Sequence, residues 1–187
     1  LGRILGEDIE ISTVFDPELG NTKADPGQIE QVIMNIVINA RDAMPFGGKL
    51  SIHTNNREFD SEFVNSHLGA KPGKHVSLTI KDNGVGMDEG TLTRIFEPFF
   101  TTKGRDKGTG LGLATVYGII KQNNGYIYVY SQPQKGATFK IYLPLIEDNL
   151  QDLNDLTDSR DNLKGSETIL LAEDDEVREI VSSFFLS

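Results

Sequence analysis

The stretch DPGQIEQVIMNIVINARDA, residues 25–43, decides the fold of this 187-residue chain. Asp25 followed by Pro26 is typical of a helix start, because aspartate caps free backbone N–H groups and proline leaves no N–H unpaired. Apolar side chains then recur every three or four residues, the period of one helix face, at Ile29, Val32, Ile33, Ile36, Ala40 and Ala43. The sequence therefore predicts a helix that ends before Pro45 and packs one face against a core.

Alternating apolar and polar segments around this helix predict a sheet. The expected strands are residues 9–15, 50–54, 76–80, 126–130 and 137–143. A short helical stretch is expected over residues 88–95, and a second long helix from Leu113 to the stop at Asn124-Gly125. We expect an α/β sandwich, with a mixed, mostly antiparallel sheet covered on one face by helices.

The chain divides by composition into three parts. Residues 1–146 are long enough for one domain with its own core, whereas residues 147–166 are acidic and polar and predict a linker. Residues 167–187 begin with an apolar, strand-like run and continue into Glu173, Asp174 and Asp175. So short a segment cannot close a core, so we interpret it as the truncated start of a second domain.

Composition narrows the function classes. The formal net charge of −10 argues against nucleic acid as a partner. The chain has no cysteine, which excludes a disulfide scaffold and thiolate metal sites. No apolar stretch approaches the length of a membrane span, and no signal-peptide pattern is present. We expect a cytoplasmic segment without direct membrane contact, which is compatible with the cytoplasmic part of a membrane-bound protein.

The helix expected over residues 25–43 carries Asn35, Asn39 and Asp42 in its second half. They are four and three residues apart, so they share one face. A buried amide without partners costs about 1–3 kcal/mol, so something must satisfy these groups. They either bond to neighbouring loops or supply oxygen ligands for a Mg²⁺ ion that also holds phosphates.

Two glycine-containing segments have a structural and a functional interpretation. Residues 82–87, DNGVGM, follow an apolar strand; they form either a turn or a site where Asp82 accepts an exocyclic amine and the glycines approach a planar ring. Residues 108–113, GTGLGL, open a helix whose free N–H groups favour phosphate. They match neither a P-loop nor a Rossmann fingerprint. Lys103, Arg105 and Lys107 precede them, as a solvated basic loop or as a cover over phosphates.

The order of these motifs resembles the ATP-binding domain of sensor histidine kinases over about residues 25–145. Residues 31–43 resemble the N box of that family, 82–86 the G1 box, 96–103 the F box and 108–113 the G2 box. Residues 136–139 are similar to the last nucleotide-binding segment. The resemblance implies the Bergerat fold, shared with DNA gyrase B, MutL and Hsp90, and ATP and Mg²⁺ as cofactors.

The resemblance also implies roles for individual residues. Asn39 would bind Mg²⁺, with Asn35 one turn before it; both are the candidate catalytic residues. Asp82 would recognise the adenine amine, with Thr138 assisting through water, and Gly84 and Gly86 would shape the adenine pocket. The other candidate nucleotide contacts are Asp42, Met87, Lys103, Gly108, Thr109, Gly110, Leu111, Gly112 and Leu113. Asp42 stands where many members of the family carry lysine, so the family's phosphate contact does not carry over to it, and the alternative role is to orient the helix.

Position 35 separates phosphoryl transfer from hydrolysis. The gyrase and MutL relatives carry a glutamate four residues before the metal-binding asparagine, whereas an amide such as Asn35 cannot act as a general base. The expected function is therefore transfer of the γ-phosphoryl group to a histidine on a separate dimerisation and phosphoacceptor domain. A hydrolase and a non-catalytic nucleotide-binding module are the alternatives.

The expected protein partners follow from the same resemblance. None of His53, His67 and His75 lies in a helical segment resembling the family's acceptor box, so the acceptor is expected on another domain. Residues 167–187 are similar to the start of a response-regulator receiver domain, which makes a receiver the second expected partner.

Overall fold

The computed structural model describes residues 5–6, 8–67, 69–104 and 108–146. Within them, five strands form one sheet in the order β1-β2-β3-β5-β4. The strands are β1 (Ile9–Val14), β2 (Gly48–Phe59), β3 (Gly73–Asp82), β4 (Tyr126–Ser131) and β5 (Ala137–Pro144). Only β1 and β2 run parallel, so the predicted mixed, mostly antiparallel sheet is confirmed. The predicted linker and receiver fragment lie outside the described residues.

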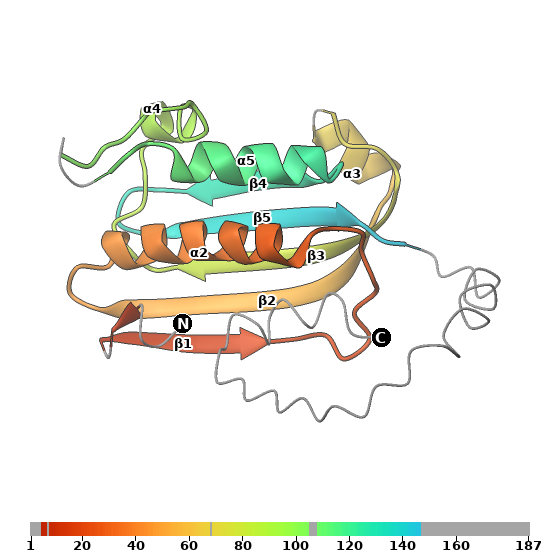
Figure 1. The fold of residues 1–187 in the computed structure, drawn as a ribbon, viewed down its shortest axis with the longest axis horizontal. Helices are drawn as coiled ribbons and strands as arrows, with labels where there is room; N and C mark the ends of the chain where they lie inside the picture. Colours follow the sequence, from red (N-terminus) through yellow and green to blue (C-terminus); the bar gives the residue numbers. More distant parts are fainter. Residues whose placement is uncertain (1–4, 7, 68, 105–107, 147–187) are drawn as a thin grey trace, which may run out of the picture.

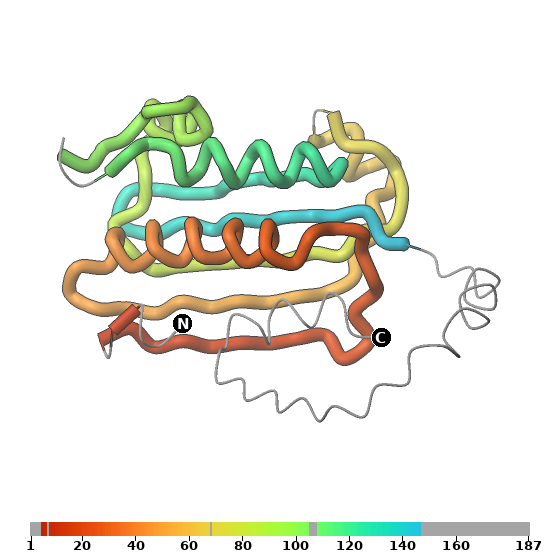
Figure 2. Tube along the Cα trace, in the orientation of Figure 1, coloured from red at the N-terminus to blue at the C-terminus, as the bar shows by residue number. Residues whose placement is uncertain are grey.

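Two long helices, α2 (Pro26–Ala43) and α5 (Gly112–Gln122), lie side by side over one face of the sheet (Figures 1 and 2). α2 begins as predicted, with the Asp25 carboxylate accepting a 2.9 Å hydrogen bond from the Gln28 N–H. The Asn123 side chain donates to Gln28 Oε1 at 3.3 Å, so α5 ends where α2 begins. The two helices therefore run antiparallel. No helix of the described residues has the length and apolar character needed to cross a membrane.

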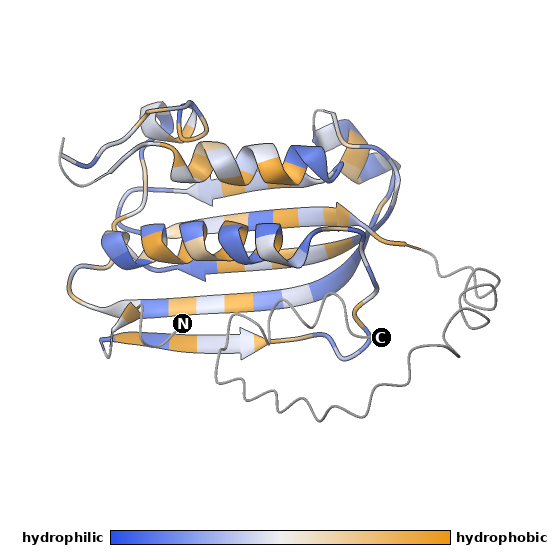
Figure 3. Cartoon of the chain, in the orientation of Figure 1, coloured by the Kyte–Doolittle hydropathy of each residue, from blue (hydrophilic) through white to orange (hydrophobic). Residues whose placement is uncertain are grey.

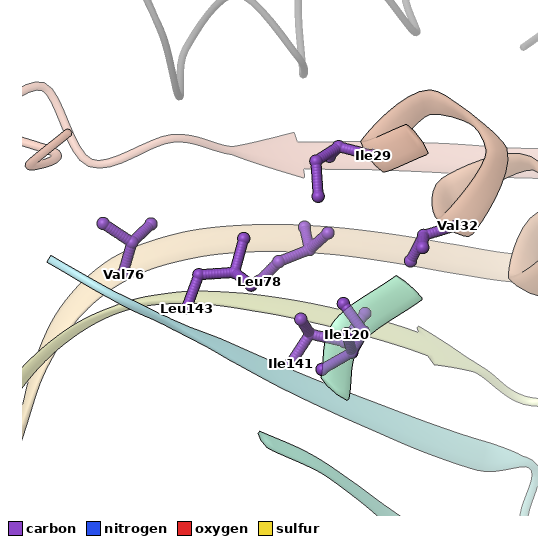
Figure 4. A pocket seen from close by; sticks show the side chains of 7 residues that line it. All are labelled: Ile29, Val32, Val76, Leu78, Ile120, Ile141 and Leu143. Carbon is purple, nitrogen blue, oxygen red and sulfur yellow. The ribbon is translucent and has the colours of Figure 1, made fainter. Parts of the chain in front are cut away.

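The core lies between the helices and the sheet. Figure 3 shows apolar and polar residues alternating along the strands, so that one side chain in two faces the helices. A void of about 10 Å³ lies within this core. Figure 4 shows its lining, contributed by α2, β3, α5 and β5: Ile29, Val32, Val76, Leu78, Ile120, Ile141 and Leu143.

A short helix, α3 (Ser61–Ser66), was not predicted, because its surroundings are polar in sequence. Its Phe63 ring stacks on Phe59 at 3.9 Å and meets Tyr142 edge-on. Tyr142 alternates with Ile141 and Leu143 of the main core, so α3 packs on the opposite face of the sheet. One end of that face is therefore also covered, and β2 and β3 extend beyond their predicted ends to reach it.

Gly118, in the middle of α5, offers a test of the helix assignment. A Cβ atom built at Gly118 meets nothing within 4 Å. Because glycine is about 0.8–1 kcal/mol less favourable than alanine inside a helix, we expect Gly118→Ala to raise the free energy of unfolding by up to that amount. Urea denaturation measures it. Gly125→Ala is the control and should destabilise, because its Cβ would lie 2.7 Å from the Tyr142 carbonyl oxygen.

Candidate functional site

A cleft opens where the C-terminal half of α2, the end of β3 and the start of α5 meet, at the left end of the sheet in Figure 1. Its volume is about 490 Å³, within the range of small-molecule and cofactor sites. It brings together most of the residues predicted from sequence, namely Asn35, Asn39, Asp42, Asp82, Gly86, Met87, Lys103, Gly108, Thr109, Gly110, Gly112 and Leu113. Arg105 and Lys107 lie outside the described residues.

Asp82 is the buried acid of this cleft, with only 4% of its surface exposed. As the last residue of β3 it turns its carboxylate back to the chain, where Oδ1 accepts hydrogen bonds from the N–H groups of Gly84 at 2.8 Å and Ala137 at 3.2 Å. Burial raises the pKa of Asp82 above its ordinary value, although these hydrogen bonds oppose the rise. The result is a fixed acceptor at the base of the cleft.

Glycines allow the backbone that follows β3 and the backbone that precedes β5 to lie close together beside Asp82. Gly86 and Gly136 both have positive φ, at 66° and 75°. A Cβ atom on Gly136 would collide with the Asp82 carbonyl oxygen. Gly84 does not line the cleft; it packs against Ala43 at the end of α2, whose carbonyl oxygen accepts a 3.0 Å bond from the Val85 N–H. Gly84 thus couples the turn to the helix and does not shape the pocket directly.

Thr138 is not brought to the cleft. Its neighbours Ala137 and Phe139 both line it, and successive side chains of a strand point to opposite faces. Thr138 pairs with Lys81 of β3 and Tyr130 of β4 on the other side of the sheet. The water-mediated role predicted for Thr138 therefore has no geometric support, and Ala137 takes the place beside Asp82. A one-residue offset on a strand reverses the face, which motif similarity alone does not detect.

The two faces of β5 can be separated by measurement. We expect Thr138→Val to change nucleotide affinity by less than about twofold, because a change to a partly exposed residue on the other face of the sheet leaves contacts in the cleft intact. Ala137→Val adds two methyl groups beside Asp82 and is expected to weaken affinity by about tenfold or more. Isothermal titration calorimetry of both variants measures this difference. Equal losses would place Thr138 back in the site.

The start of α5 is open to a ligand. Its N-cap residue, Leu111, makes no side-chain capping bond, so the first N–H groups of the helix lack that partner. Gly110, at φ 66°, lies against the backbone of Phe99, whose N–H donates to the Gly110 carbonyl at 2.9 Å. Leu111 itself is 41% exposed and does not line the cleft. Asn35 lies close to this helix start, because a Cβ on Gly112 would be 3.6 Å from its Oδ1.

Lys103 connects the cleft's two candidate metal-binding side chains. Its Nζ donates to Asn39 Oδ1 at 3.1 Å and to Asp42 Oδ2 at 2.6 Å. Arg41 bonds the other carboxylate oxygen, with Nη2 3.0 Å from Asp42 Oδ1. Burial alone would raise the pKa of Asp42, but the hydrogen bonds and charges of Lys103 and Arg41 outweigh it, so the pKa lies below its ordinary value.

The donor chemistry at this point fits a hard cation. In the described part of the chain, no three His, Cys, Asp or Glu side chains form a metal-binding group. Mg²⁺ commonly takes only one or two protein oxygens, with phosphates and waters as the remaining ligands. The Asn39 and Asp42 oxygens already converge on one positive charge, the Lys103 ammonium, which stands where a cation would bind.

Some lining residues were not singled out as site residues from the sequence. Ala137 and Phe139 come from β5, and Phe100 and Thr101 from the turn that follows α4 (Glu89–Leu92). All four lie in the segments 96–103 and 136–139, and the resemblance of these segments to the family's motifs was the signal that could have indicated them. Nothing in Ala137 itself did so, because small residues on a strand are common.

The mostly antiparallel sheet and the two helices on one face define an α/β sandwich, with a cleft between the helices and the end of the central strand β3. The chain belongs to the family described as "Histidine kinase-, DNA gyrase B-, and HSP90-like ATPase", which matches residues 24–147.

Within that family, the chain is similar in sequence to named sensor and sporulation kinases. The chain is 43% identical over 183 residues to sensor kinase CckA of Brucella abortus, covering 94% of this chain and 19% of that protein. It is 38% identical over 136 residues to sporulation kinase A of Bacillus subtilis, covering 73% and 20%. The chain thus spans about a fifth of the length of these curated relatives.

Two solved structures share the fold. The catalytic domain of histidine kinase ThkA is similar with a TM-score of 0.57 and 28% identity, over 76% of this chain and 82% of that one. Full-length ShkA in complex with AMPPNP gives a TM-score of 0.58 and 26% identity, over 75% and 26%. The predicted fold class is confirmed.

Proposed function

We propose that this chain contains the ATP-binding catalytic domain of a sensor histidine kinase. In this role the cleft positions Mg·ATP so that the γ-phosphoryl group reaches a histidine on a separate helical domain. The observation that carries the proposal is the meeting of Asp82, Asn39 and the open start of α5 in one cleft of nucleotide size. The similarity to named histidine kinases supports it.

Each part of the cleft suits one part of the nucleotide. The Asp82 carboxylate accepts a hydrogen bond from the adenine amine, and Gly86 lines the cleft where the ring would lie. The first N–H groups of α5 face the phosphates, where a helix N-terminus favours negative charge. Asn39, with Asp42 nearby, would hold Mg²⁺, which when bound neutralises phosphate charge. Positioning and charge neutralisation account for most of the catalysis in such phosphoryl transfers.

Asn35 favours transfer over hydrolysis. It lines the cleft beside Gly112, one turn before Asn39, where it faces the region of the phosphates. An amide side chain cannot take a proton from water at neutral pH, so this position supplies no general base. The nucleotide is therefore held for an external acceptor, and a hydrolase is the less favoured function.

Mixing the chain with the helical phosphoacceptor domain of the same kinase and γ-labelled ATP tests the proposal. Label should appear on the acceptor histidine and not on this chain. Asn39→Ala is the control, and transfer should fall to background because the metal ligand is missing. Rapid steady release of inorganic phosphate by this chain alone would contradict the kinase function.

We also propose a partner domain, a metal ion and a location for this domain. The likeness to the Brucella protein covers 94% of this chain, so it extends past residue 146, and Glu173 and Asp174 resemble the acidic residues of a receiver domain. We therefore expect a receiver as the second partner, Mg²⁺ as the metal and a cytoplasmic location. If a segment that begins at residue 167 and has the full length of a receiver domain did not fold, the receiver assignment would be contradicted.

A further inference from the structure

One ammonium group bridges two segments that lie far apart in sequence. Lys103 bonds Asn39 across 64 residues and Asp42 across 61, with both partners on α2. The Lys103 and Asp42 side chains are only 32% and 30% exposed, so the contact is partly shielded from water. Of the two, the Asp42 bond is the shorter and joins opposite charges, so Asp42 is the stronger anchor of the pair.

The backbone around Lys103 is fixed as well. Its N–H donates to Thr101 Oγ1 at 3.1 Å, which closes a local turn. Gly108 approaches the same turn: a Cβ there would lie 2.8 Å from Thr101 Oγ1 and 3.4 Å from Lys103 Cβ. The backbone contacts of this turn therefore help to hold the Lys103 ammonium beside Asn39.

We infer that Lys103 is the resident cation of the metal site, held on Asn39 Oδ1 by Asp42, and that a divalent ion must displace its ammonium to reach that oxygen. This inference rests on the proposed function. Two positive charges cannot share a partly shielded oxygen without repulsion, so occupancy by Lys103 and by a metal ion are mutually exclusive there. Asp42 keeps the displaced ammonium near the cleft, where it faces the phosphates.

As a consequence, the Lys103 ammonium partly takes the place of the metal ion in the nucleotide site. With Lys103 present, ATP binds measurably without Mg²⁺, because the ammonium offsets phosphate charge. Added Mg²⁺ then has to compete with it. Removing the ammonium should weaken Mg²⁺-free binding and, at the same time, lower the Mg²⁺ concentration at which binding is half restored.

The test measures, by calorimetry, the binding of a non-hydrolysable ATP analogue at a series of Mg²⁺ concentrations. Lys103→Met keeps the length of the side chain and removes its charge; we expect the Mg²⁺ midpoint to fall about tenfold, a usual size for coupling between sites. Arg41→Met is the matched control, because it removes an equal charge from the same carboxylate but from its other oxygen. Its midpoint should stay within about twofold of the wild type.

The possible results distinguish a failure of the Lys103 inference from a failure of the proposed function. If the wild type binds the analogue but Lys103→Met shifts the midpoint no more than Arg41→Met, or raises it, Lys103 does not compete for Asn39 and the inference fails alone. If the wild type fails to bind at saturating Mg²⁺, the proposed function fails. Lys103→Ala repeats the measurement should the methionine variant misfold, and circular dichroism checks both.

Discussion

Asp82→Asn is expected to reduce affinity for adenine nucleotides by about 100-fold or more while leaving the domain folded. The Asp82 carboxylate is the buried acceptor of the cleft, and two backbone N–H groups fix its position. Asparagine can still accept both bonds through its oxygen, so the local backbone should persist. Its amino group would then face the adenine amine, donor against donor, and buried polar groups left unpaired cost factors of this size.

Calorimetric titration of the variant with ATP and Mg²⁺ measures the loss. Asp88→Asn is the control, because Asp88 is the exposed N-cap of α4, where asparagine caps equally well. Its affinity should match the wild type. Tight binding by Asp82→Asn would remove Asp82 from the adenine contact, and an unfolded variant would show that the carboxylate is needed for the fold itself.

The pH dependence of Asp82 has a defined sign. Burial raises the pKa of the folded carboxyl above its ordinary value of 3.8. Between those two pKa values the folded state binds more protons than the unfolded state, so stability falls as pH rises through that interval. The charged group therefore costs stability at neutral pH, and Asp82→Asn should melt at the same temperature or higher.

Nucleotide binding should respond to pH in the opposite direction. The adenine contact needs the ionised carboxylate, so affinity should decline as pH falls towards the raised pKa, beginning above the range of an ordinary aspartate. Nucleotide titrations between neutral and mildly acidic pH measure this loss of affinity. Melting curves of the nucleotide-free protein at the same pH values show whether the protein is still folded.

Gly110→Ala is expected to impair both nucleotide binding and folding. Gly110 adopts φ 66°, which costs an alanine about 1–2 kcal/mol, and the added Cβ would collide with the backbone of Phe99. The start of α5 must then move away from the Phe99 turn. Because phosphate recognition depends on where the first N–H groups of that helix point, we expect nucleotide affinity to fall by at least about tenfold, with a lower melting temperature.

The matched control is Gly118→Ala, the same substitution in the same helix at a site with open space and no positive φ. It should bind nucleotide normally and gain stability. Melting curves with and without Mg·ATP measure both effects together. If Gly110→Ala retained full affinity, the N–H groups of α5 would not be phosphate contacts.

The sequence alone determined the architecture, because the signals for it are local. The three- to four-residue period of residues 25–43, with Asp25 and Pro26 at its start, predicted α2. The alternation along residues 76–80 and 137–143 predicted strands that lie side by side in the sheet. These patterns reflect which face each residue must bury, so they can be read without knowing what lies opposite.

The sequence also placed the main candidate residues, because their order along the chain is distinctive. The motifs alone predict Asn39, Asp82 and Gly110 as site residues, and all three line one cleft. Their roles toward ATP stay predictions. Asn35 at the position of a glutamate in the hydrolase relatives is a single-residue signal that depends only on side-chain chemistry, so it is visible in the sequence.

Only the tertiary structure decided which neighbours these residues have. The motifs assign Thr138 to the site, but strand alternation turns it away and puts Ala137 beside Asp82. The pairing of Lys103 with Asp42 spans 61 residues and has no signature in either segment. Period and order fix which face of an element a residue occupies, whereas contacts across the chain depend on how elements pack. Folding alone brings the Lys103 ammonium onto Asn39 Oδ1, the oxygen that we propose as a metal ligand.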